Sequence, residues 1–280
     1  MNFEFTDDQR MIMETAREFA QTEIAPTAVE RDIKAEFPAE ILKKLGELGF
    51  LGMIVSPEYG GAGLDTISYV MTMIEISKVD ASVGVIMSVN NSLVCFGLEK
   101  YGTEYIKEKY LIPLAKGEKL GAFALSEPEA GSDATQQKTT ADKEGDYYIL
   151  NGIKNWITNG KNADYYLVMA TTDKSKGHHG ISTFVVEEGM SGFDKGKKED
   201  KMGIRSSDTC SLLFENCKVP SKNLVWEEGK GFNFAMNTLN GGRIGIAAQA
   251  VGIAEASLEA SIKYSKERKA FGAPISNLQA

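Results

Sequence analysis

The chain has 280 residues, and its 31 Lys and Arg against 39 Asp and Glu give a formal net charge of −8 at pH 7. This acidic balance, without a Lys/Arg-rich run or a long apolar run, disfavours nucleic acid as the main partner and predicts no membrane span. Three cysteines without a C-x-x-C spacing and only two histidines, the adjacent His178 and His179, exclude a disulfide framework and a metal site and favour a reducing compartment.

The first part of the chain has the periodicity of helices. Thr6 and Gln9 form a capping-box pattern, and apolar residues then recur on one helical face up to an interruption near Pro26. No basic or apolar leader precedes this helix, so we expect no signal or transit peptide. Further helices are expected over residues 69–78, 82–98 and 104–114. We therefore predict that residues 1–117 form an N-terminal α-helical domain.

The pattern changes to strands in the next part. Asn151-Gly152 lies between two β-rich runs, residues 147–150 and 153–158, and it predicts a hairpin turn there because both turn positions favour positive φ. Strand-like runs recur at residues 165–170, 181–186 and 211–214. We expect residues 118–226 to form a middle β-domain, either a barrel or a sandwich.

Residues 227–280 return to a helical pattern that is rich in glycine. Each helical glycine costs roughly 0.5–1 kcal/mol relative to alanine, so Gly241, Gly242, Gly245 and Gly252 are expected to pack closely against another helix or a ligand. One long helix cannot bury its own apolar face. The expected fold is therefore an α+β multidomain protein in which 227–280 is the beginning of a C-terminal helical bundle, incomplete at Ala280.

Two segments in the β-domain have the residue types of a binding site. After Phe123 and Leu125, the run from Ser126 to Asp133 combines small hydroxyl residues with Gly131 and a proline-fixed turn, which lets backbone N–H groups and Ser132 approach a polar ligand. Read alone, such a run is more often a tight turn.

The second segment contains Trp156, Ile157 and Thr158. An indole with a hydroxyl two residues further on places both side chains on one face of a strand, which suits packing against a flat ring and one hydrogen bond to it. The alternative is a tryptophan that simply belongs to the core.

These two segments resemble the acyl-CoA dehydrogenase family, and further family-like segments follow in order at residues 200–205, 228–232, 240–247 and 267–272. The resemblance covers essentially the whole chain and is greatest to the short-chain, butyryl-CoA type from anaerobic bacteria. The resemblance implies FAD-dependent α,β-dehydrogenation of a short-chain acyl-CoA to the trans-2-enoyl-CoA. It also implies reoxidation by electron transfer flavoprotein and a cytoplasmic bacterial protein that is a homotetramer when full length.

The resemblance further implies two sets of binding residues. Trp156 would flank the flavin and Thr158 would bond near its reactive nitrogen, while Arg268 and Gln279 would reach the FAD of a neighbouring subunit, where the planar fork of an arginine suits a diphosphate. The complete cofactor set is Phe123, Leu125, Ser126, Gly131, Ser132, Trp156, Ile157, Thr158, Arg268, Phe271 and Gln279. The substrate set is Ser132, Asn240, Gly241, Gly242 and Arg243.

The catalytic base departs from the family pattern. The reaction needs a carboxylate that removes the α-proton; most members place this glutamate beyond the position that matches Ala280, and a minority place it where this chain has Gly242. We therefore expect no catalytic residue within the chain, a base beyond Ala280, and no activity of this chain alone. The alternatives are a non-catalytic acyl-CoA-binding or split-protein subunit, and an acyl-CoA oxidase or flavin monooxygenase of the same fold.

Overall fold

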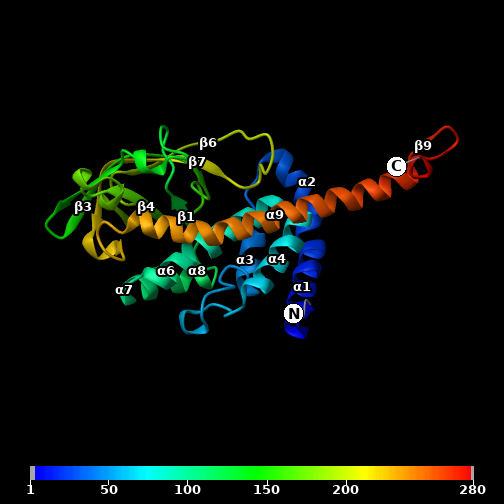
Figure 1. Cartoon of the computed structure of the whole chain (residues 1–280), viewed down its shortest axis with the longest axis horizontal. Helices are drawn as coiled ribbons and strands as arrows, with labels where there is room; N and C mark the ends of the chain where they lie inside the picture. The colour runs from blue at the N-terminus through cyan, green and yellow to red at the C-terminus, as the bar shows by residue number, and fades with distance from the viewer. Residues whose placement is uncertain (1–3, 279–280) are drawn as a thin grey trace.

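The computed structural model describes residues 4–278 and arranges them as helices, then a β-sheet, then one long helix (Figure 1). This order confirms the predicted fold class. The N-terminal helices are α1 (Asp7–Phe19), α2 (Ala25–Lys34), α3 (Ala39–Glu47), α4 (Thr66–Val79), α5 (Ala81–Ser88), α6 (Phe96–Tyr101), α7 (Glu104–Ile106) and α8 (Ile112–Ala115). Three π-helical segments join them: η1 (Ala20–Ile24), η3 (Val89–Cys95) and η4 (Lys107–Leu111). A short 3₁₀ turn, η2 (Pro57–Tyr59), precedes α4.

The start of α1 confirms the capping-box prediction. The Thr6 hydroxyl accepts the Gln9 N–H at 3.2 Å, and the Gln9 side chain accepts the Thr6 N–H at 3.0 Å. The interruption near Pro26 is not a break, because the chain passes through the π-helical η1 and Pro26 falls in the first turn of α2. A proline is tolerated there since its missing N–H has no intrahelical acceptor.

The helix expected over residues 82–98 is divided by η3, which carries a buried asparagine. The Asn90 amide donates to the Leu51 carbonyl at 2.8 Å and the Leu114 carbonyl at 3.3 Å, and its oxygen accepts the Gly121 N–H at 3.0 Å. One side chain thus joins η3, the turn after α3 and the helix α8 to the first strand. The stretch Ala81–Tyr101 has the length and hydropathy of a membrane span, but 78% of its most apolar window is buried in the protein, as expected of a core helix.

The described residues form a sheet of eight strands in the order β6-β7-β3-β2-β4-β5-β8, with β1 paired to β4. β1 and β4 are parallel, as is the single β2 to β4 contact, and the remaining neighbours are antiparallel. The strands are β1 (Gly121–Ala124), β2 (Thr140–Glu144), β3 (Tyr147–Thr158), β4 (Tyr165–Thr171), β5 (Ile181–Glu187), β6 (Phe193–Lys198), β7 (Thr209–Pro220) and β8 (Leu224–Val225).

The predicted hairpin at Asn151-Gly152 is wrong. These residues lie inside the continuous strand β3, where the register against β7 shifts between Leu150 and Gly152. Gly152 has φ 148°, and a Cβ there would come within 2.7 Å of the Thr139 Cα. The positive φ that the sequence indicated therefore serves a bulge, and the hairpin turn lies between β2 and β3, at Gly145 with φ 58°.

The final part is α9 (Gly231–Glu267), followed by the small hairpin β9 (Lys269–Ala270) and β10 (Ala273–Pro274). Gly242, Gly245 and Gly252 confirm the expected close packing, whereas the expectation for Gly241 is wrong, because a Cβ there would make only an ordinary 3.6 Å contact with the Ser92 carbonyl oxygen. A Cβ at Gly245 would lie 2.6 Å from the Tyr69 hydroxyl, and one at Gly252 would lie 2.6 Å from the Ile74 carbonyl oxygen of α4. The C-terminal half of α9 then extends beyond the rest of the chain (Figure 1).

Candidate functional site

The loop that follows β1 lies against the end of β3. The Asn155 N–H donates to the Ser126 carbonyl at 2.8 Å, and the Lys154 ammonium donates to the Leu125 carbonyl at 3.1 Å. Phe123 in β1 and Leu125 both pack in the hydrophobic cluster between the helices and the sheet. The two segments singled out in the sequence therefore form one surface.

Trp156 is the most prominent side chain on this surface. Its φ is 62° and its side chain is 64% exposed, whereas Ile157 beside it is 2% exposed and belongs to the sheet core. The register of β3 against β7 shifts between Lys154 and Ile157, so the strand bulges here. Positive φ in a non-glycine residue costs on the order of 1–3 kcal/mol and is concentrated at functional sites. The indole is thus held outward and does not belong to the core.

The polar groups on this surface suit a flat, polar ring. Among the described residues, the hydroxyls of Ser126, Ser132 and Thr158 have no hydrogen-bond partner. An added Cβ at Gly131 would meet nothing within 4 Å, so the loop is open on that side. A tricyclic flavin with polar edges therefore fits the groups present, because the indole can pack against the face of the ring and the hydroxyls can form hydrogen bonds to its heteroatoms.

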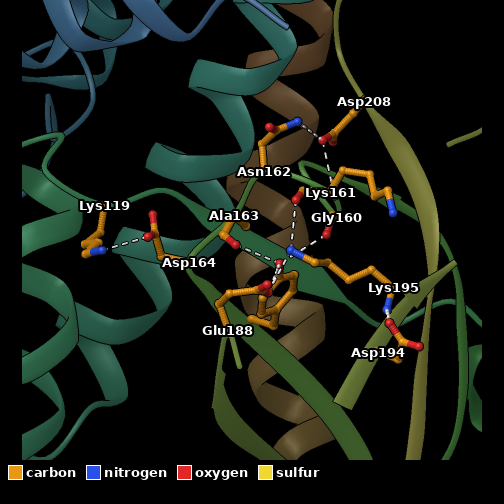
Figure 2. Close-up of polar contacts among 11 residues, drawn as sticks. Lys119, Gly160, Lys161, Asn162, Ala163, Asp164, Glu188, Asp194, Lys195 and Asp208 are labelled. Atoms are coloured by element: carbon orange, nitrogen blue, oxygen red, sulfur yellow. Dashed lines mark hydrogen bonds and ion pairs between the residues drawn. The ribbon is translucent and has the colours of Figure 1, made fainter. Parts of the chain in front are cut away.

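The turn that follows Thr158 is fixed by charged side chains (Figure 2). The Asp208 carboxylate accepts the Lys161 N–H at 3.1 Å, and the Lys195 ammonium donates to the Lys161 carbonyl at 2.9 Å and pairs with Glu188 at 2.7 Å. Burial raises the pKa of the Asp208 carboxyl above its usual value. The end of the strand that carries Trp156 is thereby held in place.

A pocket of about 360 Å³ opens where α9 meets η3. Its walls are mainly apolar, with Arg243 as the charged residue, and they comprise Ser88, Val89, Leu93, Leu239, Gly242, Arg243 and Ile246. The Arg243 guanidinium donates to the Asn240 side chain at 2.6 Å. A Cβ at Gly242 would lie 2.7 Å from the Leu93 Cδ2. The predicted substrate residues of α9 thus line or flank one pocket, with Gly241 half-buried beside it.

The pocket wall and the base of the loop share one hydrophobic cluster. This cluster contains Val89 and Leu125 as buried members, with Leu93, Phe123 and Leu239 packed against it. Side chains of the pocket wall and of the loop base therefore pack in the same core.

The remaining cofactor residues lie elsewhere. Arg268 and the 96%-exposed Phe271 follow α9 at its far end, and a helix of its 37 residues spans about 55 Å. The hairpin that carries them lies far from β3 of the same chain (Figure 1). This position is compatible with the expected contact with the FAD of a neighbouring subunit. Gln279 lies outside the described residues. No group of three or more His, Cys, Asp and Glu in the described part of the chain is arranged to hold a metal ion.

Two buried charged residues at this site were missed from the sequence. Lys154 is 0% exposed, and it pairs at 2.7 Å with Glu127, which is 5% exposed. Burial lowers the pKa of Lys154 to about 8, although the negative charge of Glu127 acts to raise it. Burial by itself would raise the pKa of Glu127, but the positive charge of Lys154 keeps that pKa below its usual value. Glu127 lies in a mainly polar loop, and Lys154 lies in a strand-forming run in which the neighbouring Ile153 is the apolar residue, so local periodicity does not predict that either charge is buried.

Models of the acyl-CoA dehydrogenase N-terminal, middle and C-terminal domains match residues 6–118, 122–217 and 229–280. The chain therefore belongs to the acyl-CoA dehydrogenase family, a family of oxidoreductases, and the resemblance is confirmed. It is 50% identical over 279 residues to the short-chain specific acyl-CoA dehydrogenase of Clostridium acetobutylicum, covering 100% of this chain and 74% of that protein.

Solved structures give the same relationship. The butyryl-CoA dehydrogenase of Megasphaera elsdenii superposes with a TM-score of 0.97 at 49% identity, over 100% of this chain and 74% of that one. A chain from a study of the electron transferring flavoprotein of Acidaminococcus fermentans gives 0.98 at 54% identity, over 100% and 73%. A glutaryl-CoA dehydrogenase of Mycobacterium smegmatis, solved with FADH2, gives 0.92 at 36% identity, over 98% and 69%.

Proposed function

We propose that the protein binds FAD and a short-chain acyl-CoA, such as butyryl-CoA, for dehydrogenation to the trans-2-enoyl-CoA, with the electrons passed to electron transfer flavoprotein, and that the base for this reaction is not among the described residues. The observation that carries this proposal is the surface on which the outward Trp156 and the free hydroxyls of Ser126 and Thr158 lie. The apolar pocket at Gly242 and Arg243, where α9 meets η3, gives it further support. It is supported by the similarity to short-chain and butyryl-CoA enzymes.

The residues on this surface would hold FAD, which when bound accepts a hydride from the substrate β-carbon. The Trp156 indole covers a ring face and excludes water from it, because it is exposed and held outward by the bulge. The Ser126 and Thr158 hydroxyls donate to the ring's polar edge, and the main chain at Leu125, Gly131 and Ile157 lies alongside.

Arg268, Phe271 and Gln279 would complete the FAD site of a neighbouring subunit in a homotetramer. Support comes from α9, whose free half exposes large apolar side chains such as Leu258 at 60% and Tyr264 at 58%. An apolar helix face of this kind needs a covering partner.

The acyl-CoA would lie between the loop and α9. Ser132, Asn240 and Arg243 supply polar groups for the thioester and its amide-containing arm, and the apolar walls at Val89, Leu93 and Leu239 receive the acyl chain. The close approach of Leu93 to Gly242 limits the pocket's depth, which favours a short chain.

We also propose that none of the described carboxylates removes the α-proton. Gly242 has no ionisable side chain, and Glu255 and Glu259 on α9 pair with Lys78 at 3.2 and 3.0 Å on the protein's outer side. A base placed at 242 would enter the pocket from its wall after the end of the Leu93 side chain moves aside, since an added Cβ would otherwise lie 2.7 Å from it. Gly242→Glu, with Gly242→Gln as the uncharged match of the same size, tests this assignment. We expect bleaching of the flavin by butyryl-CoA in the Glu variant and not in the Gln variant or the wild-type chain.

The proposal is tested with the protein reconstituted with FAD. We expect butyryl-CoA to perturb the flavin absorption spectrum at lower concentration than palmitoyl-CoA, and Trp156→Ala to weaken FAD binding. Failure to retain FAD, or a spectrum that no acyl-CoA changes, would contradict it. In the Gly242→Glu variant, oxidation by electron transfer flavoprotein supports a dehydrogenase, whereas rapid reaction with dioxygen would instead indicate an oxidase. The cytoplasmic location and the domain limits 1–117, 118–226 and 227–280 remain predictions.

A further inference from the structure

The Lys154 ammonium lies at the centre of the loop that carries Ser126 and Ser132. It donates to three acceptors: the Leu125 carbonyl at 3.1 Å, Glu127 at 2.7 Å and Gln137 at 2.9 Å. An ammonium has three protons, so each has one acceptor. Two of these acceptors are at the start of the loop and one is near its end, and the lysine itself belongs to β3.

Glu127 closes the loop from the opposite side. Its carboxylate accepts the backbone N–H groups of Lys138 and Thr139, the latter at 3.1 Å. Its own backbone forms a two-way bridge with Ala130, with N to O distances of 3.0 and 3.2 Å. The ion pair therefore joins both ends of the loop to each other and to the strand, two residues before Trp156.

The tip of the loop has few other contacts. Gly131 and Ser132 are exposed, and an added Cβ at Gly131 would meet nothing within 4 Å. The position of Ser132 relative to Trp156 thus depends on what holds the base of the loop. The side chains that hold it are Lys154 and Glu127, beside the backbone bond from the Asn155 N–H to the Ser126 carbonyl.

Stability alone is a weak reason for such a pair. Removing two charges from water costs several kcal/mol per ion, and well-packed apolar residues often replace a buried pair without loss. What apolar residues cannot do is specify one position of a loop through five directed hydrogen bonds. The pair therefore has the properties expected of a positioning element.

We propose that Lys154 and Glu127 are positioning residues for the cofactor and substrate site, fixing the loop from Leu125 to Thr139 on β3 so that Ser126 and Ser132 face the ring held by Trp156 and Thr158. This inference rests on the proposed function, which it extends to two residues that touch neither ligand. The loss of either charge lets the loop move, because the remaining partner is left buried and unpaired.

The test compares Lys154→Met and Glu127→Gln with Lys218→Met, the same change at an exposed lysine of the same sheet. For Lys154→Met we expect about a tenfold or greater rise in the Kd for FAD, since displacements of about 1 Å at supporting residues have effects of this size or more. The absorption bands of bound FAD should change shape, and the perturbation by butyryl-CoA should weaken. Glu127→Gln should change the same bands by a smaller amount, and Lys218→Met should leave them as in the wild type.

Hydrogen exchange separates this inference from the proposed function. Faster exchange at the Lys138 and Thr139 amides in Lys154→Met, with exchange in the rest of the sheet unchanged, supports the positioning role. A wild-type protein that binds no FAD would contradict the proposed function but not this result. A folded Lys154→Met protein with wild-type exchange and flavin spectrum overturns the inference. If that variant does not fold, Glu127→Gln decides by the same two measurements, and wild-type values overturn the inference.

Discussion

Replacement of Gly252 by alanine should destabilise the protein even though alanine is the better helix former. Gly252 is buried on α9 where this helix crosses α4. An added Cβ would lie 2.6 Å from the Ile74 carbonyl oxygen, 2.9 Å from the Ser77 Cβ and 3.1 Å from the Lys78 nitrogen. Two of these atoms are backbone, so the two helices themselves would have to separate.

The magnitude follows from two opposing effects. Alanine stabilises a helix interior by about 0.5–1 kcal/mol relative to glycine, whereas forcing an extra carbon into a packed contact costs about 1–3 kcal/mol. We expect a net loss of about 1–2 kcal/mol in the free energy of unfolding. Gly241→Ala is the matched control, because its nearest atom, the Ser92 carbonyl oxygen, would be at an ordinary 3.6 Å; it should be neutral or slightly stabilising.

Urea unfolding followed by circular dichroism measures both variants on the ligand-free protein. The Gly252→Ala midpoint should fall with an unchanged m-value, and the Gly241→Ala midpoint should stay or rise. A Gly252→Ala protein as stable as the wild type would refute the reasoning, since it would mean that the α4–α9 contact yields without cost.

Three further predictions concern stability. Asp65→Ala should cost about 1 kcal/mol at pH 7 by removing the N-cap of α4. The Ser68 N–H lowers the pKa of Asp65 below its usual value, so this contribution is present above the unfolded pKa and is lost as the pH falls through the folded pKa; wild type and variant should converge in urea titrations over that fall. Arg31→Met leaves the buried Asp80, paired at 2.7 Å, without its countercharge and with only the N–H groups of Ser82 and Val83 at the start of α5. It should cost about 3–5 kcal/mol in the same assay; a loss below about 1 kcal/mol would contradict it. Asn90→Ala orphans the Gly121 N–H and two carbonyls and should lower stability by about 1–3 kcal/mol or more, with faster exchange at the Gly121 amide as the direct measurement.

Part of the candidate site was indicated by local signals. Residue type and spacing singled out Trp156, Thr158 and the small residues from Ser126 to Ser132, but they left a core tryptophan and a simple tight turn as alternatives. The positive φ of Trp156 and its 64% exposure decided that it faces outward. The family resemblance added Asn240 to Arg243, which do line or flank one pocket. Contact of these residues with FAD or acyl-CoA remains a prediction.

Lys154 and Glu127 were not predictable in this way. They are 27 residues apart in the chain, and their pairing depends on the loop folding back onto β3. A lysine beside an isoleucine in a strand has the same local pattern whether the lysine is buried or solvated. Only the three acceptors that converge on it, from both ends of the loop, decide that it is buried.

The length of 280 residues, the acidic composition, the helix caps and the order of helical, β and helical parts are properties that the sequence determined by itself, because each depends on neighbours a few residues apart. Thr6 caps α1 for that reason. The tertiary structure alone decided that Gly152 forms a bulge against Thr139 rather than a turn, and that Gly245 and Gly252 admit a second helix. The bulge and the helix contacts depend on atoms that are distant in the sequence. Several backbone conformations are allowed locally at these glycines, and only one of them lets the distant segments pack together.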